Sequence, residues 1–419
     1  MPKFIINGKK QLKGEIEVHG AKNAATPILA ACLLTSQECV LENIPRIADV
    51  LNMLEILKSI GVKAEWLGEH KLQIQTKNLN LSKMDKTSIA KMRSSILLLG
   101  PLLARVGQQA IIMPGGCEIG VRPIDTHLMA LENLGAKTTK NNKIYFLEAK
   151  KLIGREFVMN EFSVTATENA IMAAVLAQGE TIIHCAAAEP HVQDLCNFLN
   201  KMGAQISGIG SHTLQIRGVK KLSGVNYKII SDPIETGTFI CLAGAMQNNI
   251  IIKNCQPQFL KMELSKFQQA NINCEISKNQ ILVKPTKNIK AVNIHNMPYP
   301  GFAADLLQPF AVLMTQANGL SLIHDWMYED RFKYIIDLNK MGAHCFLCDP
   351  HRVLIQGPTA LAGREITSYD LRAGASLLIA ALTAKGKSVI HQAEIIDRGY
   401  EKIEQRLQQL GADIKRIEP

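Results

Sequence analysis

Several features that mark whole classes of protein are scarce or missing in this sequence. Aromatic residues make up only 5% of the chain, and no basic run alternates with phenylalanine or tyrosine, which argues against the stacking platforms of single-strand nucleic-acid binders. The longest apolar stretches, 96–104, 170–177 and 376–384, are about half of the ~18 residues that a membrane span needs. The first ten residues contain no apolar segment of the signal-peptide type. We therefore expect a cytoplasmic protein without a nucleic-acid or membrane partner.

The cysteines are not arranged as a disulfide framework or a metal site. Ten cysteines are scattered without regular spacing, which in a chain of this length favours reduced thiols. Cys345 and Cys348, with His344 and His351 nearby, resemble half of a zinc site, but no second pair stands at the required distance. We interpret them as alternating strand residues and expect no metal and no cofactor.

Length and charge set the scale of what is present. A chain of 419 residues with 47% hydrophobic residues exceeds the size of one hydrophobic core, so two domains are expected. The formal net charge of +10 indicates an anionic substrate or partner, because a positive field concentrates anions.

A helix end followed by a short strand recurs six times along the chain. The residue that ends each helix is glycine five times and asparagine once, and these are the residues that best tolerate the left-handed conformation at a helix C-terminus. The six positions are Gly61, Gly135, Gly203, Asn271, Gly342 and Gly411. The intervals of 74, 68, 68, 71 and 69 residues cover the whole chain, which indicates an internal repeat.

Each repeat also contains a second helix that is apolar nearly all round and must be buried on every side. These helices are predicted at 24–34, 94–105, 166–177, 236–246, 303–315 and 373–384. A unit of about 70 residues is too long for most solenoid repeats, so two globules of three units each are favoured. A cleft between two such globules is the usual place for a polar substrate.

The first candidate site lies where Gly20–Pro27 enters an apolar helix. Lys22 at a helix start adds a full positive charge to the free N–H groups there, which together favour an anion. The alternative, preferred on this segment alone, is that Asn23 caps the helix and Lys22 is solvated.

The second candidate site is the glycine-rich segment Pro114–Asp125. Its three glycines and two prolines predict a loop, and it holds Cys117 five residues before Arg122. A cation lowers the pKa of a nearby thiol and makes it a nucleophile or proton donor. A buried structural cysteine is the alternative, but such cysteines lie in apolar surroundings, so we favour a functional role.

The third candidate set consists of charged residues at the ends of the apolar helices. Arginine suits this position in an anion site, because its planar group gives carboxylates and phosphates two parallel hydrogen bonds. The alternative for any one of these residues is a helix cap or a surface ion pair. The set is Arg93, Asp305, Arg331, Asp370, Arg372, Asp397 and Arg398.

With these residues assembled, the whole chain resembles the UDP-N-acetylglucosamine 1-carboxyvinyltransferases, a family of enolpyruvyl transferases. The motifs that carry the resemblance are Gly20–Ala24, Pro114–Asp125, Ile234–Phe239, Pro300–Asp305, Tyr328–Arg331, Asp370–Ala375 and Asp397–Glu401. The resemblance implies an α/β fold of two inside-out barrels, each made of three βαβαββ units. One domain would span 22–229 and carry the Cys117 loop, and the other would combine 1–21 with 230–419. The active site would lie in the cleft between them.

The resemblance also implies a reaction and a role for each matching residue. The family transfers the enolpyruvyl group of phosphoenolpyruvate to the 3-hydroxyl of UDP-N-acetylglucosamine and releases phosphate, which is the first committed step of peptidoglycan precursor synthesis. Lys22, Arg122 and Arg398 would hold phosphoenolpyruvate with help from Arg331 and Arg372, Cys117 would donate a proton or aid product release, and Asp305 would accept the sugar's proton. Further substrate contacts would come from Asn23, Arg93, Pro123, Ile124, Asp125, Thr126, Met327 and Asp370. We expect a monomer or weak homo-oligomer.

Some positions depart from the family pattern, and they cluster near the expected sugar-nucleotide contacts. Glu161 stands where a lysine is common, Thr165 where a glycine is common, and Pro233 where an arginine is usual. Tyr299, Ala303, Ala304 and His19 also differ. A paralogue that binds a sugar nucleotide without turnover, or a transferase with another acceptor such as a shikimate phosphate, is therefore the alternative. The retained Cys117, Asp305 and Arg398 favour the active transferase.

Overall fold

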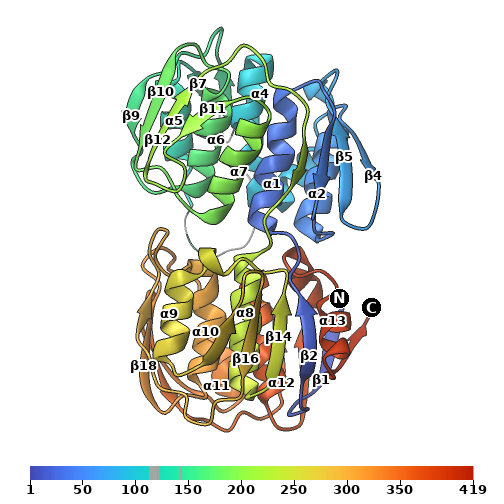
Figure 1. Cartoon of the computed structure of the whole chain (residues 1–419), viewed down its shortest axis with the longest axis vertical. Coiled ribbons are helices and arrows are strands. Elements are labelled where there is room, and N and C mark those ends of the chain that lie inside the picture. The colour runs from blue at the N-terminus through green and yellow to red at the C-terminus, as the bar shows by residue number, and fades with distance from the viewer. Residues whose placement is uncertain (113–119, 121, 142–143, 419) are drawn as a thin grey trace. The chain divides into compact units, whose positions relative to one another are not determined.

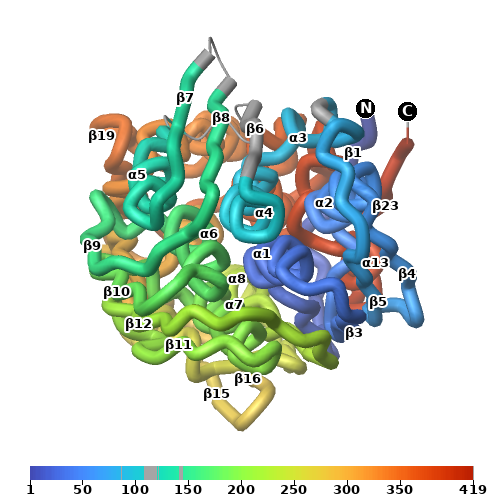
Figure 2. Tube along the Cα trace, turned by 90° about the horizontal axis from the view of Figure 1, so that it is seen from above, coloured from blue at the N-terminus to red at the C-terminus, as the bar shows by residue number. Residues whose placement is uncertain are grey.

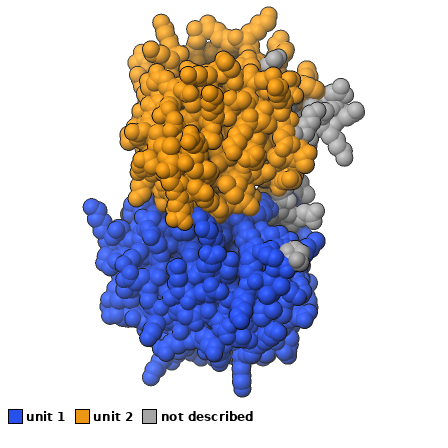
Figure 3. All heavy atoms as spheres, turned by 90° about the vertical axis from the view of Figure 1, so that its right-hand side faces the viewer, with its two compact units in different colours: residues 1–19, 117–121, 231–419 blue, residues 20–116, 122–230 orange. Residues whose placement is uncertain are grey.

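The computed structural model describes residues 1–112, 120, 122–141 and 144–418. The chain forms two compact units, which Figure 3 colours separately. Unit 1 is built mainly from residues 1–19 and 231–418, and unit 2 from residues 20–112 and 122–230. No described helix is both long enough and apolar enough to cross a membrane.

The core of each unit is made of helices that are buried nearly all round. In unit 2 these are α1 (Lys22–Ala31), α4 (Leu99–Val106) and α6 (Val164–Ala174), and in unit 1 they are α8 (Pro233–Met246), α10 (Leu307–Met314) and α12 (Leu371–Thr383). Every residue of α10 and α12 is buried. Short 3₁₀ turns extend them at η1 (Cys32–Leu34), η3 (Arg93–Leu98) and η5 (Ala304–Leu306). The six predicted apolar helices are therefore confirmed.

The second helix of each repeat is half-exposed and ends at the predicted residue. These helices are α2 (Ala48–Ser59), α5 (Asp125–Asn133), α7 (Pro190–Lys201), α9 (Lys261–Gln269), α11 (Ile335–Lys340) and α13 (Ile403–Gln409). All six cap residues have positive φ, from 63° at Asn271 to 105° at Gly203. In each copy the cap N–H and the next N–H bond back to the last helical turn, as Gly203 does to Asn200 and Ala204 to Leu199. This is the Schellman arrangement, and it explains the glycine period.

Three sheets form the outside of unit 2 in its described residues (Figures 1 and 2). The first contains β13 (Asn226–Lys228), β3 (Cys39–Glu42), β5 (Lys71–Gln75) and β4 (Lys63–Trp66), in that order. The second contains β6 (Gln108–Ile112), β8 (Ile144–Glu148) and β7 (Lys137–Asn141). The third contains β11 (Gln205–Ser207), β12 (Thr213–Arg217), β10 (Glu180–His184) and β9 (Glu156–Val158). The remaining helical turns of unit 2 are η2 (Leu81–Lys83) and α3 (Lys86–Lys91).

Unit 1 repeats this arrangement with three four-stranded sheets in its described part. The first contains β21 (Glu365–Thr367), β22 (Lys387–His391), β1 (Lys3–Asn7) and β23 (Asp413–Ile417). The second contains β15 (Asn273–Ile276), β16 (Gln280–Lys284), β14 (Asn249–Lys253) and β2 (Lys13–Glu17). The third contains β17 (Ile294–His295), β18 (Gly319–His324), β20 (Arg352–Gly357) and β19 (His344–Asp349). Two 3₁₀ turns, η4 (Pro257–Phe259) and η6 (Ala393–Arg398), complete it.

Helices inside and sheets outside make each unit an inside-out α/β barrel, so the predicted fold class is confirmed. Strand residues alternate between buried and exposed, as in β12, because one face of each sheet packs on the helices. Phe310 of α10 packs against Phe267 of α9 and against Phe302, with ring centroids 5.5 Å apart in both pairs. Cys345 and Cys348 both lie on strand β19, as expected, but only Cys345 is buried, and the register with β20 shifts between Leu347 and Asp349.

Strands that lie far apart in the sequence close both units. Strand β1 pairs with β22 and β23, and β2 runs parallel to β14, so the first 17 residues complete two sheets of unit 1. Strand β13 closes unit 2 in the same way by pairing in parallel with β3. The chain passes from unit 1 to unit 2 after His19 and returns to unit 1 after Ile230.

Candidate active site

A carboxylate shared by two buried arginines is the centre of the charged cluster in unit 1. Asp305 lies in η5, at the start of the buried helix α10. Its Oδ1 accepts a hydrogen bond from Nη2 of Arg331 at 2.9 Å, and its Oδ2 accepts one from Nε of Arg372 at 3.1 Å. The structure therefore brings together three residues that the sequence named separately.

Both arginines keep donors that no described residue satisfies. The side chains of Arg331 and Arg372 are only 8% and 3% exposed, and Nη1 of each has no hydrogen-bond partner among the described residues. Burial lowers the pKa of both guanidinium groups, but Asp305 opposes this for Arg331, and Tyr400 followed by Asp305 oppose it for Arg372, so the net pKa of each is raised. Permanently charged, planar donors with unused N–H groups suit a carboxylate or phosphate ligand.

Aromatic rings lie against both arginines. The Arg331 guanidinium lies 4.4 Å from the centroid of the Tyr328 ring, and that of Arg372 lies 5.4 Å from the Tyr400 ring. The Tyr400 hydroxyl forms a 2.9 Å hydrogen bond with Thr238 of α8. These contacts restrict the rotamers of both arginines.

Asp370 is the N-cap of α12, as the alternative interpretation of the charged residues at helix ends predicted. Its Oδ1 accepts hydrogen bonds from the backbone N–H groups of Arg372 and Ala373 at 2.8 and 2.9 Å, which starts α12. Its Oδ2 accepts one from Gln308, whose amide also donates to the Arg331 carbonyl. Gln308 is almost fully buried and was missed in the sequence, because a glutamine inside an apolar helix gives no motif.

Asp325 is a second residue that sequence reasoning missed. Its Oδ1 accepts hydrogen bonds from Asn296 and from the backbone N–H groups of Met327 and Tyr328, at 2.8, 3.0 and 3.1 Å. Burial raises the pKa of this carboxyl against the lowering effect of Arg331. Asp325 therefore shapes the turn that carries Met327 and Tyr328. A lone aspartate after a strand gave no signal of this role.

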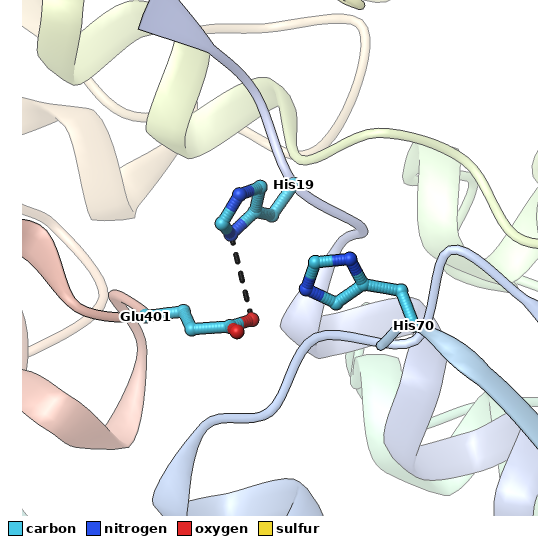
Figure 4. A group of neighbouring side chains, drawn as sticks. All are labelled: His19, His70 and Glu401. Carbon is cyan, nitrogen blue, oxygen red and sulfur yellow. Dashed lines mark ion pairs between the residues drawn. The ribbon is translucent and has the colours of Figure 1, made fainter. Parts of the chain in front are cut away.

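Arg398, Asp397 and His19 are further named residues of unit 1. Asp397 accepts a hydrogen bond from Nη1 of Arg416 at 3.0 Å, an ion pair of the kind given as the alternative for this residue. Arg398 is half-buried at the end of η6, two residues before Tyr400. The His19 ring and the Glu401 carboxylate point toward each other, with 3.4 Å between Nδ1 and Oε2 (Figure 4). His70, the third side chain drawn, belongs to unit 2. Pro233, another departure from the family pattern, occupies the first turn of α8 after its N-cap Asp232, a position that accommodates proline.

Lys22 in unit 2 is the first residue of α1, and its Nζ lies 2.7 Å from Oδ2 of Asp49. The N-cap of α1 is Ala21, without a side-chain hydrogen bond. The alternative that Asn23 caps this helix beside a solvated Lys22 is therefore wrong, since the helix begins one residue before Asn23 and Lys22 is paired and only 13% exposed. An ammonium at an uncapped helix start remains compatible with an anion site.

Most of the residues expected to contact the sugar nucleotide in unit 2 lie around the start of α5. Nη2 of Arg93 donates to the carbonyls of Arg122 and Pro123 at 2.6 and 3.1 Å, which holds the chain just before Ile124, the residue that precedes α5. Asp125 is exposed and Thr126 is buried at the first two positions of the helix.

Two departures from the family pattern contact this same helix start. Thr126 donates a hydrogen bond to Oε1 of Glu161 at 3.2 Å, and Nε2 of His127 lies 2.8 Å from the hydroxyl of Thr165. Burial, with a smaller effect from Arg93, lowers the pKa of His127 to about 3, so its ring is neutral. The positions of Glu161 and Thr165 were noticed in the sequence, but these partners could not be foreseen. Cys117 lies outside the described residues.

Comparison with known proteins identifies the family. Residues 6–407 match the model of the EPSP synthase (3-phosphoshikimate 1-carboxyvinyltransferase) family. The chain is 42% identical to the UDP-N-acetylglucosamine 1-carboxyvinyltransferase of Bradyrhizobium diazoefficiens and 43% identical to that of Borreliella burgdorferi. It is 44% identical to UDP-N-acetylglucosamine 1-carboxyvinyltransferase 1 of Carboxydothermus hydrogenoformans. Each alignment covers at least 99% of this chain and 98% of the relative.

Solved structures agree on the fold. The enolpyruvyl transferase NikO from Streptomyces tendae superposes with a TM-score of 0.91 at 22% identity, over 100% of this chain and 99% of that one. An EPSP synthase from Acinetobacter baumannii gives a TM-score of 0.74 at 19% identity over 100% of both chains. The chain has the enolpyruvyl transferase fold and belongs to the UDP-N-acetylglucosamine 1-carboxyvinyltransferase family.

Proposed function

We propose that this protein transfers the enolpyruvyl group of phosphoenolpyruvate to the 3-hydroxyl of UDP-N-acetylglucosamine and releases inorganic phosphate. Identity of 42–44% over the full length of relatives with this name is the observation that carries the proposal. The cluster of Asp305, Arg331 and Arg372 supports it with suitable chemistry. The reaction would supply peptidoglycan precursor synthesis in the cytoplasm, with the protein acting as a monomer or weak homo-oligomer.

Anion recognition would fall to the cations described above. Phosphoenolpyruvate carries a carboxylate and a phosphate, and Lys22, Arg122 and Arg398 would hold these groups while Arg331 and Arg372 assist. The unused Nη1 groups of Arg331 and Arg372 support this assignment, because a bound anion would satisfy buried donors that otherwise carry a desolvation penalty.

Asp305 would act as the base that accepts the proton of the sugar's 3-hydroxyl. Two arginines favour the ionised form of this carboxylate, which is the form able to accept a proton. A proton added to the methylene carbon of phosphoenolpyruvate would leave the neighbouring carbon open to the sugar oxygen. The tetrahedral intermediate would then lose phosphate together with a methyl proton, which restores the double bond.

The remaining residues would act in the Cys117 loop and at the sugar nucleotide. Cys117 would donate a proton or aid product release. Asn23, Arg93, the segment 122–126, Met327 and Asp370 would contact or position substrate. The Arg93 bonds to the carbonyls of Arg122 and Pro123 support a fixed 122–126 segment.

The test is phosphate release from phosphoenolpyruvate, measured with and without UDP-N-acetylglucosamine. We expect release only when both substrates are present, a loss of about a hundredfold or more in kcat for Asp305→Asn, and little change for the exposed control Asp330→Asn. Tight binding of the sugar nucleotide without any release would contradict the proposal and favour a binding paralogue. Release with another acceptor alone would show that the acceptor differs.

A further inference from the structure

Glu263 is a buried acidic residue on a helix whose other charged residues reach solvent. It lies on α9 and is only 4% exposed. It stands one turn before Phe267, on the inner face of the helix, whereas Lys261 and Gln268 are exposed. A carboxylate is rarely buried without a partner that compensates for its lost hydration.

The internal repeat shows what this position usually contains. Glu263 stands eight residues before the left-handed cap Asn271, and the equivalent position of every repeat is buried. The equivalent residues of the other repeats are Met53, His127, Leu195, Tyr334 and Ile403. Packing alone can therefore be satisfied here by an apolar side chain such as methionine or leucine, so the carboxylate needs another explanation.

The partner of Glu263 is the backbone of the segment that carries Asp305. Its Oε1 accepts a hydrogen bond from the N–H of Ala303 at 2.9 Å. Ala303 has an extended conformation and immediately precedes η5, where Asp305 lies. The adjacent Phe302 is buried against Phe310, so the segment is held on one side by packing and on the other by Glu263.

We propose that Glu263 is a positioning residue that fixes the backbone before Asp305 and so sets the geometry in which Asp305 meets the hydroxyl of the acceptor. The inference rests on the proposed function, in which Asp305 accepts that proton. Since small displacements of a catalytic group cause large losses in rate, the bond to Ala303 acts on turnover more than on substrate affinity.

The charge of Glu263 gives this bond a pH dependence. Burial raises the pKa of Glu263 to about 7, against the lowering effect of the Ala303 N–H. Above that pH the ionised carboxylate accepts a charge-assisted hydrogen bond, and below it the protonated acid accepts a weaker one. On β15, against which α9 packs, burial raises the pKa of the Cys274 thiol to about 12, and Asp305, two residues after Ala303, accepts hydrogen bonds from the two arginines.

Two substitutions at Glu263 and one matched control test the proposal. Glu263→Met copies Met53, keeps the core filled and leaves the Ala303 N–H without its acceptor. Glu263→Gln keeps a neutral acceptor oxygen. Lys261→Gln, the control, removes an exposed charge from the same helix and leaves the bond between Glu263 and Ala303 in place. We would measure kcat and KM from pH 6 to 8, and amide hydrogen exchange at Ala303.

Glu263→Met should lower kcat roughly ten- to a hundredfold with KM changed less than about threefold, and should speed exchange at Ala303. We expect kcat of the unsubstituted protein to fall between pH 8 and 6; Glu263→Gln should lose this fall, whereas Lys261→Gln should keep it. An unchanged rate of amide hydrogen exchange at Ala303 in Glu263→Met would overturn the proposal. So would a pH profile of kcat for Glu263→Gln that is identical to that of the unsubstituted protein. If the unsubstituted protein releases no phosphate, the proposed function fails, and the exchange measurement still decides whether Glu263 holds the segment.

Discussion

Replacing Asp305 by asparagine removes the carboxylate that Arg331 and Arg372 share in unit 1. Asp305 accepts hydrogen bonds from Arg331 at 2.9 Å and from Arg372 at 3.1 Å. An asparagine side chain has one amide oxygen and can accept only one of them, and its amino group would face the other guanidinium. Breaking a fully buried ion pair costs about 3–5 kcal/mol. Because the Asp305 side chain is 24% exposed, solvent screens part of this effect, and we expect a loss of about 2–3 kcal/mol in the free energy of unfolding.

Urea denaturation of the two proteins measures this loss, and inorganic phosphate supplies a second readout. A phosphate ion can replace the missing carboxylate between the arginines, so it should stabilise Asp305→Asn more than the unsubstituted protein. The exposed substitution Asp330→Asn should stay within about 0.5 kcal/mol of the unsubstituted protein. Equal stability of Asp305→Asn and the unsubstituted protein, or an equal response of both to phosphate, would refute the reasoning that the two buried cations depend on Asp305.

Two further predictions concern the repeat and the interior of unit 2. Gly203 has a φ of 105°, and an added Cβ would meet no atom within 4 Å. Gly203→Ala should therefore lower the free energy of unfolding by about 1–2 kcal/mol through backbone strain alone. An unchanged midpoint of urea denaturation would argue against the left-handed cap. Burial, with a smaller effect from Glu189, raises the pKa of Glu168 well above 4.5. The folded state thus binds a proton that the unfolded state releases, so the contribution of Glu168 to the free energy of unfolding falls as pH rises above about 4.5. Over that range Glu168→Gln should gain stability relative to the unsubstituted protein. Parallel curves of unfolding free energy against pH for the two proteins would contradict this.

The architecture was predictable because it depends on local signals that occur six times. A left-handed residue after each amphipathic helix and an apolar helix in each repeat are visible in the sequence, and Asn271 shows the same Schellman bonds as the glycines. The closure of the sheets was not predictable in this way. Strands β1, β2 and β13 pair with partners remote in the sequence, and no local pattern specifies such partners.

The charged residues of unit 1 were predicted by their types and positions, but their supports were not. Asp305, Arg331 and Arg372 form one cluster, as the resemblance led us to expect of substrate-binding residues. Glu263 and Asp325 act on backbone N–H groups, and a contact with the backbone leaves no trace in the pattern of side chains. The cap at Asn23, which was the alternative interpretation of the first site, is wrong because the helix begins at Lys22, one residue earlier.

The most direct test of the central claim is the identity of the product. The protein would be incubated with phosphoenolpyruvate and UDP-N-acetylglucosamine, and the sugar nucleotide recovered and examined by NMR. The account predicts vinyl protons of an enol ether attached at the 3-oxygen of the sugar, formed in step with inorganic phosphate. Recovery of unmodified UDP-N-acetylglucosamine after prolonged incubation with folded protein, or attachment at another oxygen, would contradict it.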